Sequence, residues 1–243
     1  MSQRIENEPC FVLHRRDFRN TSLILEVFSI NHGRVAMVAK GARRPKSPTN
    51  ALLQVFQPLL ISWSGRGELH TLTQVEAAEF VKPLAGITYA SAYYLTELIF
   101  RLLKHSDVHE ELFILYAKAL TALRKSGDNS QQAEICLRLF EKNLLQELGY
   151  GLVLDHDVNS GEAIVPDQHY YYISEHGPVL CNSENVPNGP KIRGRSIIDL
   201  NNETLSDLES LRDCKRLMRN VLQGYIGDKP LQSRMLYNQR SSS

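Results

Sequence analysis

Short runs in which apolar and polar residues alternate fill the first eighty residues. This period of two predicts β-strands, and five such runs are present, at residues 11–14, 22–28, 35–40, 56–63 and 68–75. The last two flank Ser64-Gly65-Arg66-Gly67, whose glycines suit a tight hairpin. Five short strands with glycine turns and no strong helix between them predict a small closed barrel such as an OB-fold, with an SH3-like barrel as the nearest alternative.

After Pro83 and Gly86 the apolar period changes to that of a helix. Helices are predicted at 87–104, from a capping box of Asp107 and Glu110 to about 126, and from 130 to Gly149. A last helix is predicted from Ser206, capped with Glu209, to about 224. The order predicts an α+β multidomain protein, with an OB-fold domain at 1–82 and a helical domain at 83–243.

Residues 151–195 are rich in turn formers and contain one predicted hairpin, 169–173 with 179–181. We interpret this stretch as a region inserted into the helical domain.

Charge is distributed unevenly along the chain, although the formal net charge is only +1. Residues 1–82 hold eleven Arg or Lys against seven Asp or Glu, residues 83–211 ten against eighteen, and residues 212–243 seven against two. Two basic ends therefore flank an acidic middle, a polarity that indicates a nucleic-acid surface. The outer face of the last helix offers a candidate second basic surface, formed by Arg212, Lys215, Arg216 and Arg219.

One long segment, 27–67, contains six cations and no Asp or Glu. These cations are Arg34, Lys40, Arg43, Arg44, Lys46 and Arg66. A positive potential that no local carboxylate neutralises suits a polyanion that releases its counterions on contact. The alternative is a solvated loop, which is the commoner meaning of an isolated cation cluster.

Motifs for catalysis are missing from the sequence. It has no G-x-x-x-x-G-K-[ST] phosphate loop, no G-x-G-x-x-G after a strand and no G-x-S-x-G elbow. Asp155, His156 and Asp157 come nearest to a metal or acid-base group, but neighbours in an extended chain point to opposite sides. We predict a protein that is not an enzyme.

The location of the protein is predicted from its cysteines and its N-terminus. The four cysteines are far apart, so we expect reduced thiols. The polar start MSQRIENEP is no secretory signal, and no window of eighteen apolar residues exists. A cytoplasmic, nucleoid-associated location follows as an expectation.

Four blocks of sequence resemble the RecO family of bacterial DNA repair proteins. They are FVL-x₇-TSLILEVF-x₄-GRVAMVAKGARRPKS with the GRGELHTL hairpin, RLFE at 138–141, LGYG at 148–151, and G-x-KPL-x-SR at 227–234. The resemblance covers nearly the whole chain. It implies an OB-fold, a helical domain interrupted by a zinc-finger-like hairpin, and a recombination mediator without chemistry.

The family resemblance also implies partners. Members bind single- and double-stranded DNA, anneal complementary strands, associate with RecR, and help RecA displace single-stranded DNA-binding protein (SSB). Carried onto this chain, the DNA contacts fall on Arg34, Lys40 and Arg43, extended by Arg44 and Lys46. Arg138 stands where the family places a cation for the carboxylate of the SSB tail, beside Phe140. The alternative for Arg138 is an i,i+4 partner of Glu134.

This sequence departs from the family at the hairpin, where many members carry four zinc-binding cysteines. Here 157–161 lacks cysteine and only Cys181 remains, so we expect no cofactor and a hairpin held by Tyr170, Tyr172 and Val179. Phe28, Phe56 and Trp63 are expected in the core more than on a base-stacking platform. The alternative function is a non-catalytic OB-fold nucleic-acid-binding or adaptor protein without mediator activity.

Overall fold

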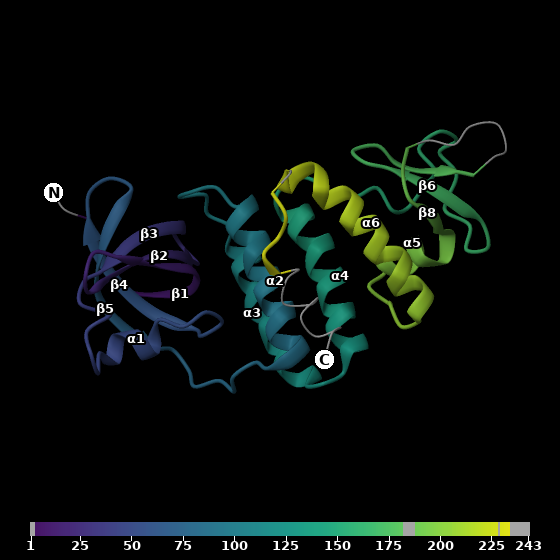
Figure 1. Cartoon of the computed structure of the whole chain (residues 1–243). Coiled ribbons are helices and arrows are strands. Elements are labelled where there is room, and N and C mark those ends of the chain that lie inside the picture. Colours follow the sequence, from purple (N-terminus) through teal and green to yellow (C-terminus); the bar gives the residue numbers. More distant parts are fainter. Residues whose placement is uncertain (1–2, 182–187, 228, 234–243) are drawn as a thin grey trace. The chain divides into compact units, whose positions relative to one another are not determined.

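A computed structural model describes residues 3–181, 188–227 and 229–233 (Figure 1). By packing, the chain forms two compact units, Met1–Ala85 with Ala92–Arg124, and Gly86–Ser91 with Lys125–Ser243. The second helix contributes residues to both units.

A closed five-stranded barrel forms the core of the first unit. Its strands are β1 (Gln3–Phe18), β2 (Ser22–Ser29), β3 (Gly33–Ala39), β4 (Leu59–Gly65) and β5 (Leu69–Ala77). They close in the order β1-β2-β3-β5-β4, with β3 and β5 parallel and the other pairs antiparallel. The predicted five-stranded OB-like barrel is therefore confirmed.

The first strand is far longer than the predicted 11–14. β1 pairs with β2 along its second half and with β4 along its first half, and the register shifts between Val12 and His14 and between Ile5 and Glu8. Such irregularities bend a strand, which allows one long strand to serve two neighbours in a closed barrel. Its charged flanks hid this length from the apolar pattern.

Alternate side chains of all five strands fill the barrel, and the centre of this core includes Val12, Leu25, Val27, Met37, Leu59 and Ile61. Phe28, Phe56 and Trp63 are also buried, as expected.

Helices α2 (Gly86–Leu102) and α3 (Glu110–Ser126) follow the barrel, and within the first unit α3 packs on its outer surface. The ring of Phe113 lies 5.2 Å from that of Phe11 and 5.4 Å from that of Phe28, measured between centroids. Tyr116 meets Phe11 edge to face at 5.1 Å. These aromatic contacts bury the outward side of β1 and β2 and fix α3 on the barrel.

A close approach explains Gly33 at the start of β3. Its φ is +63°, and a Cβ there would lie 2.0 Å from the backbone oxygen of Asp107. The loop between α2 and α3 crosses β3 at this point, with Ser106 donating its N–H to the carbonyl of Arg34 at 3.0 Å. Only glycine fits both the backbone conformation and the space.

The second unit contains α4 (Ser130–Glu147), α6 (Leu208–Ile226), the short α5 (Gly194–Asn201) and a sheet in the order β7-β6-β8. The strands are β6 (His169–Ile173), β7 (Gly177–Leu180) and β8 (Lys191–Arg193). The predicted hairpin is present, whereas α5, β8 and α1 (Pro48–Leu52) were not predicted.

The helix caps differ in part from the predictions. The carboxylate of Asp207 accepts from the N–H groups of Glu209 and Ser210 and caps α6, so the predicted cap at Ser206 is wrong by one residue. Asn129 caps α4, and Gly149 follows that helix with φ +81° as expected. Before α3, the carboxylate of Asp107, predicted as part of a capping box with Glu110, lies 3.3 Å from the imidazole Nε2 of His109.

Candidate nucleic-acid interface

Strand pairing gathers cations at one end of the barrel. Leu23 of β2 lies opposite Ala39 of β3, so the turn at 19–21 adjoins the loop that leaves β3. The N–H of Arg43 donates to the carbonyl of Thr21 at 2.9 Å, which fixes that loop against the turn.

The exposed cations at this end come from two segments that are distant in sequence. We call them the basic end, and it comprises Arg16, Arg19, Lys40, Arg43, Arg44 and Lys46. The sequence analysis did not include Arg16 and Arg19 among the DNA-binding cations. The signal for them was the basic run HRRDFR at 14–19, which directly precedes the turn into the second strand. Six cations on one rim raise the local potential for a polyanion.

Arg43 forms an ion pair with a carboxylate, that of Asp17. Its guanidinium lies 2.8 Å from Asp17 and donates to the carbonyl of Arg19 at 3.3 Å. Residues 27–67 were expected to carry cations that no nearby carboxylate neutralises. This expectation is wrong at Arg43, because Asp17 of strand β1 supplies the carboxylate. Asp17 is 69% exposed, so water screens this pair strongly.

Arg34 lies at the opposite end of β3 from Lys40 and is occupied by protein contacts. Its guanidinium donates to the carbonyls of Phe100 and Leu103, at 2.5 and 2.9 Å, and lies 3.4 Å from Glu26. Burial lowers the pKa of this guanidinium, and Glu26 opposes the shift. Arg34 therefore caps the end of α2, and the expectation of an uncompensated cation is wrong here as well.

Arg66 is exposed in the β4-β5 hairpin. The parallel pairing sets Leu69 beside Ala36, so the hairpin extends toward the start of β3, away from the basic end. The six predicted DNA-binding cations thus fall into two sets, with Arg34 and Arg66 apart from the other four.

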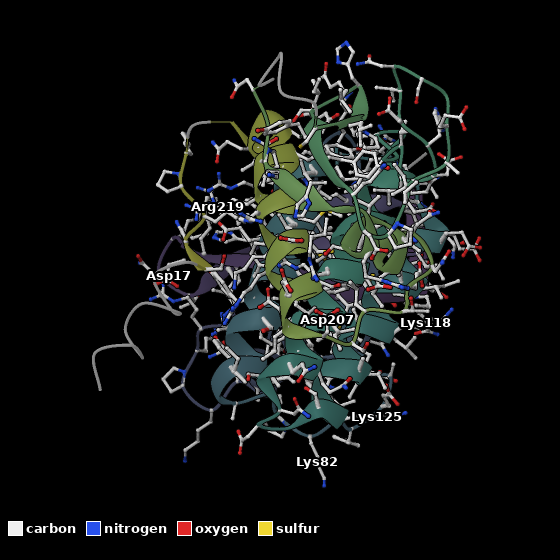
Figure 2. All side chains as sticks on the ribbon, turned by 90° about the vertical axis from the view of Figure 1, so that its right-hand side faces the viewer. Asp17, Lys82, Lys118, Lys125, Asp207 and Arg219 are labelled. Carbon is white, nitrogen blue, oxygen red and sulfur yellow. The ribbon has the colours of Figure 1, made fainter. Side chains whose placement is uncertain are left out.

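The candidate second basic surface on α6 is partly neutralised. Lys215 lies 3.3 Å from Glu134, and Arg216 lies 2.6 Å from Asp213. Arg212 and Arg219 are exposed and form no ion pair within the described part of the chain, and Arg219 extends outward from α6 (Figure 2).

Arg138 and Phe140 are both buried in α4, with 4% and 1% of their surface exposed. The guanidinium of Arg138 lies 2.9 Å from Glu141 and 3.8 Å from Glu134. The i,i+4 pairing considered for Arg138 is present, and the nearer partner Glu141 was not foreseen. A tail carboxylate would have to compete with Glu141.

Asp157 organises the hairpin region. Its side chain is buried and accepts backbone N–H bonds from Asn159 at 2.7 Å, Ser160 at 3.0 Å and Leu180 at 2.6 Å. Burial works to raise the pKa of this carboxyl, but these donors outweigh it and the pKa is lowered. Tyr170 and Tyr172 are buried as expected, while Val179 is only half-buried.

No group of three or more His, Cys, Asp or Glu side chains that could hold a metal ion occurs within residues 3–181, 188–227 and 229–233. His156 bonds Asp155 at 2.8 Å, while Asp157 serves the backbone. In the same ranges, no helix has the length and apolar character needed to cross a bilayer.

A closed OB-like barrel is an architecture that binds oligonucleotides and oligosaccharides, and the cations of the basic end favour a polyanion. Family models described as "Recombination protein O N terminal" and "Recombination protein O C terminal" match residues 1–81 and 84–235. DNA repair protein RecO of Nitrosospira multiformis is 46% identical over 235 residues, covering 96% of this chain and 95% of that protein. The RecO proteins of Dechloromonas aromatica (42%, 98% of each chain) and an Azoarcus species (44%, 96% of each) are similar throughout.

The chain belongs to the RecO family of DNA repair and recombination proteins. RecO is a non-catalytic family of recombination mediators.

Proposed function

We propose that this protein binds single- and double-stranded DNA through the basic end, anneals complementary strands, and with RecR helps RecA load on SSB-coated DNA. The observation that carries the proposal is the gathering of six exposed cations from two chain segments on one rim. Cations on exposed loops contact phosphates and do not read bases, so binding is largely independent of sequence.

Buried aromatics support the same mechanism. Phe28, Phe56 and Trp63 are 0%, 5% and 3% exposed, so none offers an open face to a base. The phosphates then supply most of the affinity, and a surface that holds two polyanions close together lowers their repulsion and promotes annealing.

The test is the salt dependence of DNA binding by a Lys40→Ala/Arg44→Ala/Lys46→Ala variant. Losing three phosphate contacts should lower the log–log slope by about 2 to 3 and weaken binding at low salt. Lys118→Ala/Lys125→Ala, which removes two cations outside the basic end, is the control, since both residues extend outward from α3 (Figure 2). It should leave the slope unchanged. Equal slopes for wild type and the triple variant would remove the basic end from the DNA surface.

Mediator activity is separated from plain DNA binding or an adaptor role by two assays. One assay measures annealing of complementary strands without nucleotide. The other measures loading of RecA on SSB-coated DNA in the presence of RecR. DNA binding without either activity would favour the simple nucleic-acid-binding module.

We also propose Arg138 as the receptor for the carboxylate of the SSB tail, with Phe140 beside it. Because Glu141 already holds this guanidinium, the tail must displace or share that carboxylate. Arg138→Ala should lower the affinity for an SSB tail peptide at least about tenfold, while Glu141→Gln should preserve or raise this affinity. Wild-type affinity in Arg138→Ala would exclude this role.

A further inference from the structure

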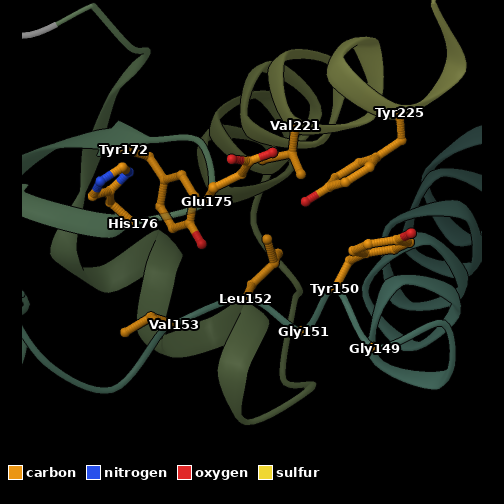
Figure 3. A pocket seen from close by; sticks show the side chains of 10 residues that line it. All are labelled: Gly149, Tyr150, Gly151, Leu152, Val153, Tyr172, Glu175, His176, Val221 and Tyr225. Carbon is orange, nitrogen blue, oxygen red and sulfur yellow. The ribbon is translucent and has the colours of Figure 1, made fainter.

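A pocket of about 330 Å³ opens in the second unit between the end of α4, the β6-β7 turn and the end of α6 (Figure 3). This volume is near the lower limit for small-ligand sites, so it suits one side chain or a small molecule. Its lining includes three tyrosines, Tyr150, Tyr172 and Tyr225, and one carboxylate, Glu175. The proposed function uses none of them.

The wall formed by Tyr150 and Tyr225 is a flat aromatic surface. Their rings stack with centroids 4.4 Å apart and planes 30° from parallel. Tyr150 follows the glycine that ends α4, and its N–H donates to the carbonyl of Leu145 at 2.7 Å, which fixes the backbone that carries the ring. Tyr150 is nevertheless 46% exposed, so the stacked pair offers area to a ligand.

The opposite wall brings a carboxylate toward the rings. Figure 3 shows the carboxylate of Glu175 beside Val221 and the hydroxyl of Tyr225 pointing into the space between Glu175 and Leu152. The hydroxyl of Tyr172 points away from Glu175, toward the backbone of Val153. Glu175 has φ +65° in the hairpin turn, a conformation that is uncommon for a residue with a long side chain. Burial, then Glu175, then Tyr150 raise the pKa of Tyr225, which agrees with a negative potential there.

The hairpin turn is also held firmly. A Cβ on Gly177 would lie 2.7 Å from Val158 and 3.0 Å from Val153, so the turn packs closely on the segment that forms the pocket floor. Glu175 therefore projects from a fixed backbone, which favours a preorganised site.

Charge decides which ligand fits. Among the lining residues that the structure describes, Glu175 is the only Asp, Glu, Lys or Arg. Aromatic faces with a carboxylate attract cations and repel phosphates. A guanidinium stacks on aromatic rings, is less strongly hydrated than an ammonium, and bonds a carboxylate through two N–H groups.

We propose that this pocket binds the arginine side chain of a partner protein, with the guanidinium on the Tyr150/Tyr225 pair and its N–H groups donating to Glu175. The site is separate from the cations of the basic end, so DNA binding and arginine binding can fail independently.

The experiment titrates the full chain, with ¹³C-labelled tyrosine rings, against a short neutral peptide that carries one arginine. The arginine peptide should shift the ring signals of Tyr150 and Tyr225. The same peptide with citrulline, which is neutral and nearly isosteric, should bind at least about tenfold more weakly, and a lysine version should fall between them. Signals are assigned with single Tyr→Phe variants, and the buried Tyr170 ring reports that the sheet is folded.

Glu175→Gln should reduce arginine affinity at least about tenfold, whereas Glu162→Gln, an exposed carboxylate of the same unit, should not change it. Three results would overturn the proposal. They are no shift up to roughly 10 mM peptide, where even a millimolar site would be mostly filled, equal binding of citrulline, and unchanged affinity in folded Glu175→Gln. Shifts caused by oligothymidylate but not by the peptide would instead mark a base-binding pocket.

Discussion

The carboxylate of Asp157 accepts the backbone N–H of Leu180 at 2.6 Å and thereby ties the loop before the hairpin to strand β7. The same side chain accepts the N–H groups of Asn159 and Ser160, so one residue fixes a turn and a strand together. In this chain a hydrogen-bonded carboxylate thus braces the region for which the family resemblance had implied zinc-binding cysteines.

Replacing Asp157 should destabilise the second unit. Asp157→Ala leaves three backbone donors without their acceptor, and we expect a loss of about 2 to 3 kcal/mol in the free energy of unfolding, measured in urea. Asp167→Ala, an exposed neighbour, is the control and should change stability by less than about 0.5 kcal/mol. Equal losses in the two variants would contradict the bracing role.

Acid should weaken the same region. Burial works against ionisation of Asp157 and Asp213, but backbone donors at Asp157, and Ser196, Arg216 and Arg193 at Asp213, lower both pKa values. A carboxyl whose pKa is lower in the folded state stabilises above its unfolded pKa of about 3.9, and this contribution disappears as pH falls through the folded value. Unfolding free energy measured from neutral pH downward should therefore fall below about pH 4, less steeply in Asp157→Asn. Parallel curves for variant and wild type would show that Asp157 does not contribute.

Removing the carboxylate of the basic end should strengthen DNA binding. Asp17→Asn releases Arg43 from its 2.8 Å partner and removes a charge that repels phosphates. We expect affinity to rise a few-fold and the log–log salt slope to steepen by about 0.9, the value for one additional phosphate contact on duplex DNA. Asp167→Asn serves as the control, and an affinity no higher than wild type in Asp17→Asn would mean that phosphates do not approach this rim.

Arg34 should matter for stability and not for DNA. Arg34→Ala removes the donor to the Leu103 carbonyl and leaves Glu26 without its guanidinium, at an expected cost of about 2 to 4 kcal/mol. Arg34→Lys should cost less because it keeps the charge. The salt slope of DNA binding should equal that of wild type in both variants, provided they are folded, and a reduced slope would return Arg34 to the DNA surface.

The sequence predicted local features well and long-range partners poorly. Alternation located β2 and β3 to within a residue or two, because the period of a strand depends on its own side chains. It could not reveal that Arg34 reaches the end of α2 or that Asp17 reaches Arg43, since these pairs join segments 69 and 26 residues apart. The short α5 and β8 were also missed, because eight residues make only about two helical turns, three residues show barely one alternation, and the stretch before them is rich in turn formers.

Barrel closure has an evolutionary consequence. The connection from β3 to β4 carries most of the basic end and joins two strands that are not neighbours in the barrel. It is held by the bond from the Arg43 N–H to the Thr21 carbonyl and by the buried Leu53 that follows the short helix α1. Lengthening it would disturb how the strands meet, whereas exchanging its outward residues costs the fold little. Selection can therefore vary the side chains of this connection more freely than its length. Differences in nucleic-acid affinity among natural relatives should arise here from substitutions rather than insertions.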